Sequence, residues 1–205
     1  MQYSLFNNSN PSSKENNKHT ENQPMSLIRK VQGFTLIELM VTIAVLGIII
    51  TIAIPGLGSF TAKMRVDNRV TELQRLLLNT RNAAINSGVL ATLCRLPDDP
   101  TEDADCQNNN DWTGRIGIIT VDGLIKEREA LPAGDRLDFI IDRVVFNPSG
   151  QLANNNVGTF NYCPKNFIDF SRGVTLSLAG RAYLSTDLNG DGLDQDRNAN
   201  TIQCI

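Results

Sequence analysis

The stretch Gly33-Phe34-Thr35-Leu36-Ile37-Glu38, continued by the apolar run LMVTIAVLGIIITIAI at residues 39–54, decides the fold of this chain. Residues 34–55 would form about 33 Å of helix, which is roughly the thickness of a bilayer core. Arg29 and Lys30 directly precede this segment, and positive charges at such a flank stay on the cytoplasmic side. We therefore expect residues 34–55 to cross a membrane once and the residues after them to lie outside the cytoplasm.

A cleaved secretory signal peptide is the other interpretation of the apolar run. The run is longer than the apolar region of such peptides, and no cleavage site of small residues follows it at the expected distance. Glu38 is also unusual, because a carboxylate near the edge of an apolar span is costly and requires a partner. We therefore favour a retained anchor in which Glu38 has a function.

The segment before Gly33 has the character of a leader peptide. Residues 1–24 are rich in Asn, Ser, Lys and Glu, have no apolar periodicity and are predicted to be disordered. Met25 opens the short cationic segment before the apolar run, and we expect it to be the true start of translation. The predicted leader therefore ends at Gly33.

The stretch Gly33–Glu38 resembles the class III signal sequence of type IV pilins and type II secretion pseudopilins. The resemblance implies that prepilin peptidase cuts between Gly33 and Phe34 and methylates the new amino terminus of Phe34. It also implies that Glu38 pairs with the amino terminus of a neighbouring subunit, a pairing that sets register more than it adds stability. Pro55, which removes one helical hydrogen bond, is expected to kink the helix.

Downstream of Pro55 the sequence predicts an amphipathic half-helix over residues 56–88, ending at Asn86-Ser87-Gly88. Its apolar residues recur three and four positions apart and form a single stripe. The stripe consists of Val66, Val70, Leu73, Leu77 and Ala84, and we expect Met64 and Leu76 to widen it. A helix with one apolar stripe requires a sheet to cover that stripe.

Residues 89–205 are predicted to form a β-rich periplasmic domain. Segments bounded by turn signals read as strands, namely residues 89–94, 115–121, 143–147, 158–163 and 174–184. The expected architecture is therefore a pilin fold of the α+β class, in which a long, kinked N-terminal helix packs on a twisted antiparallel β-sheet.

The four cysteines, Cys94, Cys106, Cys163 and Cys204, all follow the apolar run, and none forms a C-x-x-C pair. An even number downstream of an export anchor indicates two disulfides in an oxidising compartment, with four buried thiols as the alternative. Three connectivities are open. We favour Cys94–Cys106 with Cys163–Cys204, because neighbours in sequence are the easier closures.

Composition argues against an enzyme. The only histidine, His19, precedes Gly33, so the processed chain would lack histidine bases, histidine metal ligands and histidine-activated nucleophiles. No paired-carboxylate motif stands out. After Gly33 the chain carries 15 basic and 20 acidic residues, which does not suit a strongly basic nucleic-acid binder. We predict no catalytic residues and no cofactor, with calcium as the one alternative.

The globular part resembles the GspH/FimT/FimU branch of minor pilins and minor pseudopilins. The resemblance implies a minor pilin that primes or joins a type IV pilus, with a minor pseudopilin of the type II secretion system as the alternative. Its implied partners are other minor and major pilins, contacted through the N-terminal helix, prepilin peptidase and the inner-membrane assembly platform. The motifs that carry the resemblance are the two early cysteines around an acidic loop, Asp111–Arg115, Phe146–Gly150, Cys163 and Gly180-Arg181.

Two further features of the carboxy-terminal part indicate alternative binding functions, one for DNA and one for calcium. Some FimT-like members bind DNA in natural transformation through Gly-Arg-x-Arg, and here Arg181 is retained but Tyr183 replaces the second arginine. Tyrosine can stack on a base but cannot neutralise a phosphate, so a DNA-binding subunit is the second alternative.

The acidic tail fits the start of a calcium loop, D-x-N-x-D-G-x-x-D, with Asp187, Asn189, Asp191 and Asp194 as the oxygen ligands. Asn198 occupies the twelfth position, where an EF-hand has a bidentate glutamate. A solvated turn rich in Asn, Asp and Gly is the alternative interpretation.

Overall fold

The protein is described by a computed structural model covering residues 33–99, 105–153 and 155–204, and residues 52–56 are described by their backbone alone. The predicted leader with Met25 lies outside this range, except for Gly33. The chain divides into two compact units, residues 1–44 and residues 45–205.

Helix α1 spans Leu36–Ser87 and is assigned as one helix through Pro55, so the kink stays a prediction. The helix ends where the sequence predicts. Gly88 has a φ of 70°, which is the left-handed conformation that glycine adopts after a helix, and its amide donates to the Ala84 carbonyl at 3.0 Å. Across residues 33–99, 105–153 and 155–204, no helical stretch has both the length and the apolar character that a membrane crossing requires.

The α+β class is confirmed, but the strands divide between two antiparallel four-stranded sheets instead of forming one. The first sheet has the order β3-β2-β1-β5, and the second has the order β4-β6-β7-β8. The first contains β1 (Ala91–Arg95), β2 (Ile116–Thr120), β3 (Gly123–Arg128) and β5 (Arg143–Phe146). The second contains β4 (Arg136–Asp138), β6 (Gly158–Cys163), β7 (Arg172–Leu176) and β8 (Ala182–Leu184), with a short 3-10 helix, η1 (Ile168–Phe170), before β7.

Strands β3 and β4 were not predicted. The first five residues of β3 are exposed and therefore lack the alternation of buried and exposed side chains that marks a half-buried strand. Strand β4 has only three residues. The predicted segment 174–184 contains the end of β7, a turn and β8, because Gly180 reverses the chain with a φ of 73°.

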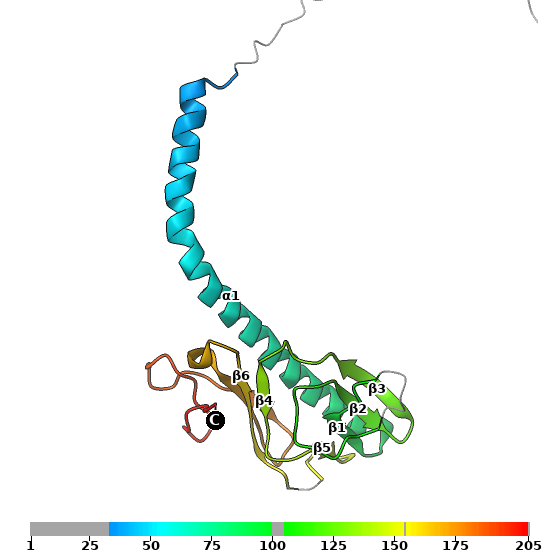
Figure 1. The fold of residues 1–205 in the computed structure, drawn as a ribbon. Helices are drawn as coiled ribbons and strands as arrows, with labels where there is room; N and C mark the ends of the chain where they lie inside the picture. The colour runs from blue at the N-terminus through cyan, green and yellow to red at the C-terminus, as the bar shows by residue number, and fades with distance from the viewer. Residues whose placement is uncertain (1–32, 100–104, 154, 205) are drawn as a thin grey trace, which may run out of the picture. The chain divides into compact units, whose positions relative to one another are not determined.

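The apolar stripe of α1 is the contact between the helix and the strands, and Figure 1 shows this part of α1 lying along both sheets. The predicted stripe residues and Leu76 are all at most 3% exposed. Met64 was wrongly predicted as part of the stripe, since it is 48% exposed. It lies two residues before Val66, and two residues correspond to about 200° around a helix.

The core between the layers includes a cluster of three aromatic rings. Trp112, in the loop between β1 and β2, meets Phe160 of β6 edge to face with ring centroids 5.0 Å apart. Phe139 stacks on Phe160 at 3.8 Å. The indole of Trp112 is buried, and its N–H donates to the Ile141 carbonyl at 2.7 Å. The cluster therefore fixes the β1–β2 loop to the second sheet.

Candidate functional site

The amino-terminal segment forms a capping box at the start of α1. The Thr35 amide and hydroxyl donate to one carboxylate oxygen of Glu38 at 2.8 and 3.0 Å, and the Glu38 amide donates to the Thr35 hydroxyl at 3.3 Å. This reciprocal arrangement satisfies amides that a helix start otherwise leaves unpaired. The sequence analysis did not single out Thr35, although the T-x-x-E spacing is a signature of such a cap.

The predicted cleavage position lies just outside the helix. Gly33 and Phe34 precede the first helical residue, Leu36, and are not part of a helix or strand. Phe34 is 88% exposed. An exposed, non-helical segment is the kind of backbone at which proteases cut most readily.

The amino-terminal half of α1 is apolar and uncovered. Between Leu36 and Ile50 its large apolar side chains are 43–76% exposed. Monomeric soluble proteins rarely expose such a continuous apolar surface, and a surface of this size marks contact with a membrane or with other proteins.

Both disulfides are present, with the connectivity that the sequence favoured. Cys94 of β1 is bonded to Cys106, and Cys163 of β6 is bonded to Cys204. Their Cα atoms are 5.6 and 5.8 Å apart, in the usual range for a disulfide. The first bond closes a polar loop after β1, and the second holds the carboxy-terminal tail against the second sheet.

Arg197 joins Arg181 and Tyr183 at the carboxy-terminal strand, although it is distant from them in the sequence. The Arg197 guanidinium carbon lies 3.8 Å from the ring centroid of Tyr183, in cation–π contact. The pKa of Tyr183 is lowered, first by a hydrogen bond with Arg181 and then by the positive charges of Arg197 and Arg181. Arg197 lies 14 residues beyond Tyr183 in the sequence, and only the tertiary structure places it on Tyr183.

The turn before β8 contains Gly180, which packs against a second glycine, Gly150. Gly180 and Gly150 have φ values of 73° and 75°, a conformation that other residues rarely adopt. A Cβ atom at Gly180 would overlap the Gly150 carbonyl oxygen. That oxygen also accepts a hydrogen bond from the Arg81 side chain of α1 at 2.8 Å. The two glycines therefore allow two turns to meet against the helix and place Arg181 directly before β8.

In the acidic tail, side-chain oxygens accept hydrogen bonds from backbone amides of the tail itself. Asp187 accepts hydrogen bonds from the amides of Gly190 and Gly192 at 2.7 and 2.9 Å. Asp191 accepts the Leu193 amide at 2.8 Å and the Asn189 side-chain amide at 2.9 Å.

Asp194, the last of the four predicted calcium ligands, contacts Ser185 and Arg172 instead. It is buried, accepts the Ser185 hydroxyl at 2.6 Å and lies 3.7 Å from Arg172. In the part of the chain that the structure describes, no group of three or more His, Cys, Asp or Glu residues could hold a metal ion. The predicted ligands Asp187, Asn189, Asp191 and Asp194 are therefore not gathered into one site.

Comparison with known families gives two matches. Residues 28–54 match the prokaryotic N-terminal methylation motif, and residues 69–180 match the family described as type II transport protein GspH. Two fimbrial proteins of Pseudomonas aeruginosa are each 41% identical to the chain over 54 residues, which are 26% of the chain and 35% of each relative. The chain thus spans about a third of the length of these curated relatives.

Among solved structures, the type IV minor pilin FimU of Pseudomonas aeruginosa has a similar fold. The match covers 62% of the chain and 92% of FimU, with a TM-score of 0.50 and 20% identity. A match to the minor pseudopilin EpsH from the type 2 secretion system of Vibrio cholerae covers 58% of the chain and 94% of EpsH, with 21% identity and a TM-score of 0.40.

Proposed function

The chain belongs to the family of type II transport protein GspH, and on this premise we propose that it is a minor pilin that primes or joins the assembly of a type IV pilus. The match of residues 28–54 to the N-terminal methylation motif, on the same chain as the GspH match, carries the proposal. Prepilin peptidase would cut between Gly33 and Phe34 and methylate Phe34. The role is structural and requires no catalytic residue.

In this proposal the two halves of α1 have different neighbours. Residues 34–55 anchor the subunit in the inner membrane and later contact other minor and major pilins. Residues 56–88 hold the periplasmic domain, residues 89–205. The exposed apolar surface from Phe34 to Ile50 supports this division, because it needs a membrane or protein cover.

Glu38 is the proposed assembly residue. In the free subunit its carboxylate is bound to Thr35, so the helix start is satisfied before assembly. We propose that on assembly the amino terminus of a neighbouring subunit pairs with this carboxylate. A buried carboxylate without a cationic partner would be strongly destabilising, so the pairing selects one register of subunits.

Deletion of the gene, with separate measurements of surface piliation and protein secretion, tests the proposal. Loss of pili with secretion intact is the expected result. Loss of secretion with pili retained would contradict the proposal and assign the chain to the alternative, a minor pseudopilin of the type II secretion system.

A second candidate function, DNA binding during transformation, is favoured by the position of Arg197. The sequence lacks the second arginine of Gly-Arg-x-Arg, but Arg197 supplies a second guanidinium beside Arg181 and next to an aromatic ring. Two cations and a stacking surface are the elements of a single-strand binding site.

A gel shift with single-stranded DNA at low salt tests this candidate. We expect both Arg181→Ala and Arg197→Ala to weaken the shift, and Lys165→Ala, an exposed lysine elsewhere on the domain, to leave it unchanged. If the wild-type chain gives no shift, the candidate is rejected.

A further inference from the structure

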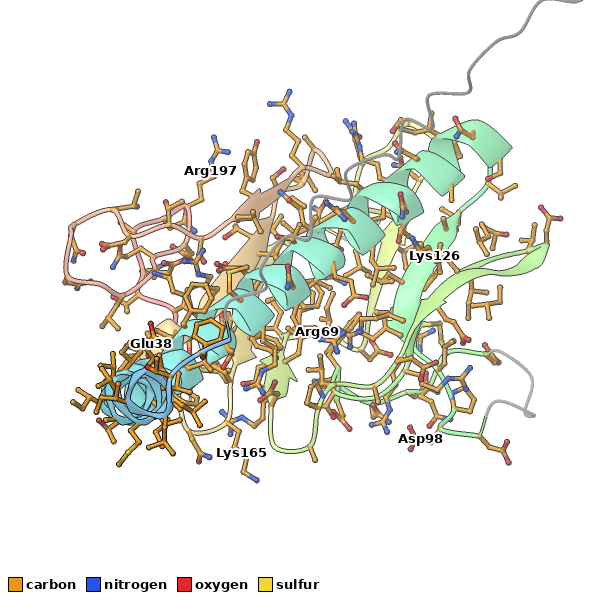
Figure 2. All side chains as sticks on the ribbon, turned by 90° about the horizontal axis from the view of Figure 1, so that it is seen from above. Glu38, Arg69, Asp98, Lys126, Lys165 and Arg197 are labelled. Carbon is orange, nitrogen blue, oxygen red and sulfur yellow. A yellow bond between two sulfur atoms is a disulfide. The ribbon has the colours of Figure 1, made fainter. Side chains whose placement is uncertain are left out.

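A charged groove lies between α1 and β3, apart from the residues discussed so far. Its volume is about 470 Å³, and its charged lining comprises Arg69, Glu72 and Arg75 of α1 and Lys126, Glu127 and Arg128 of β3. Figure 2 shows Arg69 and Lys126 on one flank of α1 and Arg197 on the other. The groove is therefore distinct from the Arg181–Tyr183–Arg197 cluster.

The two carboxylates of the groove are already paired. Glu72 binds Arg69 at 2.9 Å, and Glu127 forms an ion pair with Arg115, which lies outside the groove. Among the ion pairs of the described residues, none includes Arg75, Lys126 or Arg128. The groove thus presents three cationic side chains that form no ion pair within the described residues.

Arg128 is the most unusual of these cations, since it is only 4% exposed. Its guanidinium donates to the backbone carbonyls of Glu129, Trp112 and Gly114 at 3.1 to 3.4 Å. Burial lowers the pKa of Arg128 to about 10, so the group is still charged at neutral pH. The Glu72 carboxylate partly offsets this charge, but four cationic side chains and two carboxylates line the groove, and this balance favours an anionic ligand.

Strand β3 also carries exposed apolar side chains, but Leu124 faces away from the groove, because it pairs with Ile119 whereas Lys126 pairs with the buried Ile118. Leu124 and Ile125 of β3 are 40% and 55% exposed, and Val121 before the strand is 79% exposed. Strand β3 is the edge of its sheet, but its register shifts at Ile118/Ile119, and it carries Lys126. A bulge and a lysine are features that prevent strand pairing at an edge, so a partner would be recognised by its side chains.

We propose that this groove, which we call the Arg75–Lys126 groove, docks an acidic segment of another filament subunit, with a carboxylate beside Arg75 and Lys126. The inference rests on the proposed function. A protein segment suits the groove better than a nucleic acid, because Glu72 and Glu127 also line it and would repel a phosphate backbone, and the chain has a net charge of −3.

Photo-crosslinking in cells that make the pilus tests this proposal on the full chain. A photoreactive amino acid replaces Asn68, an exposed residue of the groove lining, and the crosslinked peptide is identified by mass spectrometry. We expect a peptide of another pilin subunit that contains Asp or Glu. The double variant Arg75→Glu/Lys126→Glu should reduce the crosslink about tenfold or more, a change that corresponds to 1.4 kcal/mol. Lys165→Glu, an exposed charge reversal outside the groove, should leave it unchanged.

Three results would overturn the proposal. One is a crosslink that does not respond to the double charge reversal, and another is no crosslink to any pilin subunit. The third is binding of a single-stranded oligonucleotide by the purified full-length chain that the same reversal abolishes, which would assign the groove to nucleic acid. A gene deletion that leaves piliation intact would instead reject the proposed function itself, so the two failures are distinguishable.

Discussion

The two halves of helix α1 have similar secondary structure and opposite surroundings. From Phe34 to Ile50 the apolar side chains are exposed, and the side-chain hydrogen bonds there are local, such as Thr35 with Glu38. From Ala62 to Ala84 an apolar stripe is buried by two sheets, and polar side chains on the same half bind residues far along the chain. Arg81, for example, binds Gly150, and Gln74 binds Ala182 at 3.0 Å.

The difference shows what each half depends on. The second half is stabilised by its own domain, because most helical stability in proteins comes from packing of an apolar face. The first half has an apolar face that the described residues leave exposed, and in the proposed function a membrane or another subunit covers it. Changes in the first half should therefore affect assembly, and changes in the second should affect folding.

The largest expected effect is on assembly. Glu38→Ala should abolish surface pili and leave membrane insertion intact, because it removes the carboxylate that we propose pairs with a neighbouring amino terminus. Immunoblots of membrane and sheared-pilus fractions measure both properties.

Glu38→Gln separates pairing from capping. Glutamine can replace glutamate in a capping box but carries no charge. We expect Glu38→Gln to lack pili as well. Normal piliation in this variant would show that capping, and not pairing, is the function of Glu38.

The second effect concerns the disulfides, which stabilise the domain that covers the second half of α1. Removal of Cys163–Cys204 by a double change to serine should cost about 4 kcal/mol of unfolding free energy, and removal of Cys94–Cys106 about 3 kcal/mol, by loop-entropy arithmetic. The order follows from their sequence separations of 41 and 12 residues. Urea unfolding of the full chain in detergent measures both, and the reverse order would contradict this account.

A pair of leucine substitutions compares the two halves directly. Leu73→Ala should cost about 3 kcal/mol, because Leu73 is 1% exposed in the core and its truncation leaves a cavity. Leu46→Ala should change domain unfolding by less than about 0.5 kcal/mol, since Leu46 is 55% exposed. Equal losses in the same urea experiment would show that the two halves unfold together.

The smallest effect is a pH dependence of the domain. Burial raises the pKa of Asp111, but hydrogen bonds from Thr113 and the Arg95 charge outweigh burial, so the net pKa lies below its ordinary value of 3.8. The contribution to stability is therefore present above pH 3.8 and is lost as the pH falls through the lower, folded-state pKa. Because the Asp111 side chain is 45% exposed, we expect well under 1 kcal/mol. Asp111→Asn should flatten the fall in urea midpoint below pH 4, and an unchanged slope would reject the assignment.

Much of the fold could be predicted from local patterns. The apolar stripe from Val66 to Ala84 follows from helical periodicity, and the helix end at Gly88 follows from the conformational freedom of glycine. Strands β3 and β4 could not be predicted this way, because one is almost fully exposed and the other is too short to show a period. The division into two sheets depends on which strands pair, and pairing is a long-range property.

The sequence by itself determined the methylation-motif match that includes Gly33–Glu38, the apolar half-helix, the α+β class and the favoured cysteine pairing, because each depends on neighbours along the chain. Only the tertiary structure placed Arg197 on Tyr183 and turned Asp194 toward Ser185 and away from a calcium loop. It also brought Arg75, Lys126 and Arg128 to one groove. These sites join residues that are distant in sequence, and no local periodicity or spacing encodes which side chains meet when helix and sheets pack.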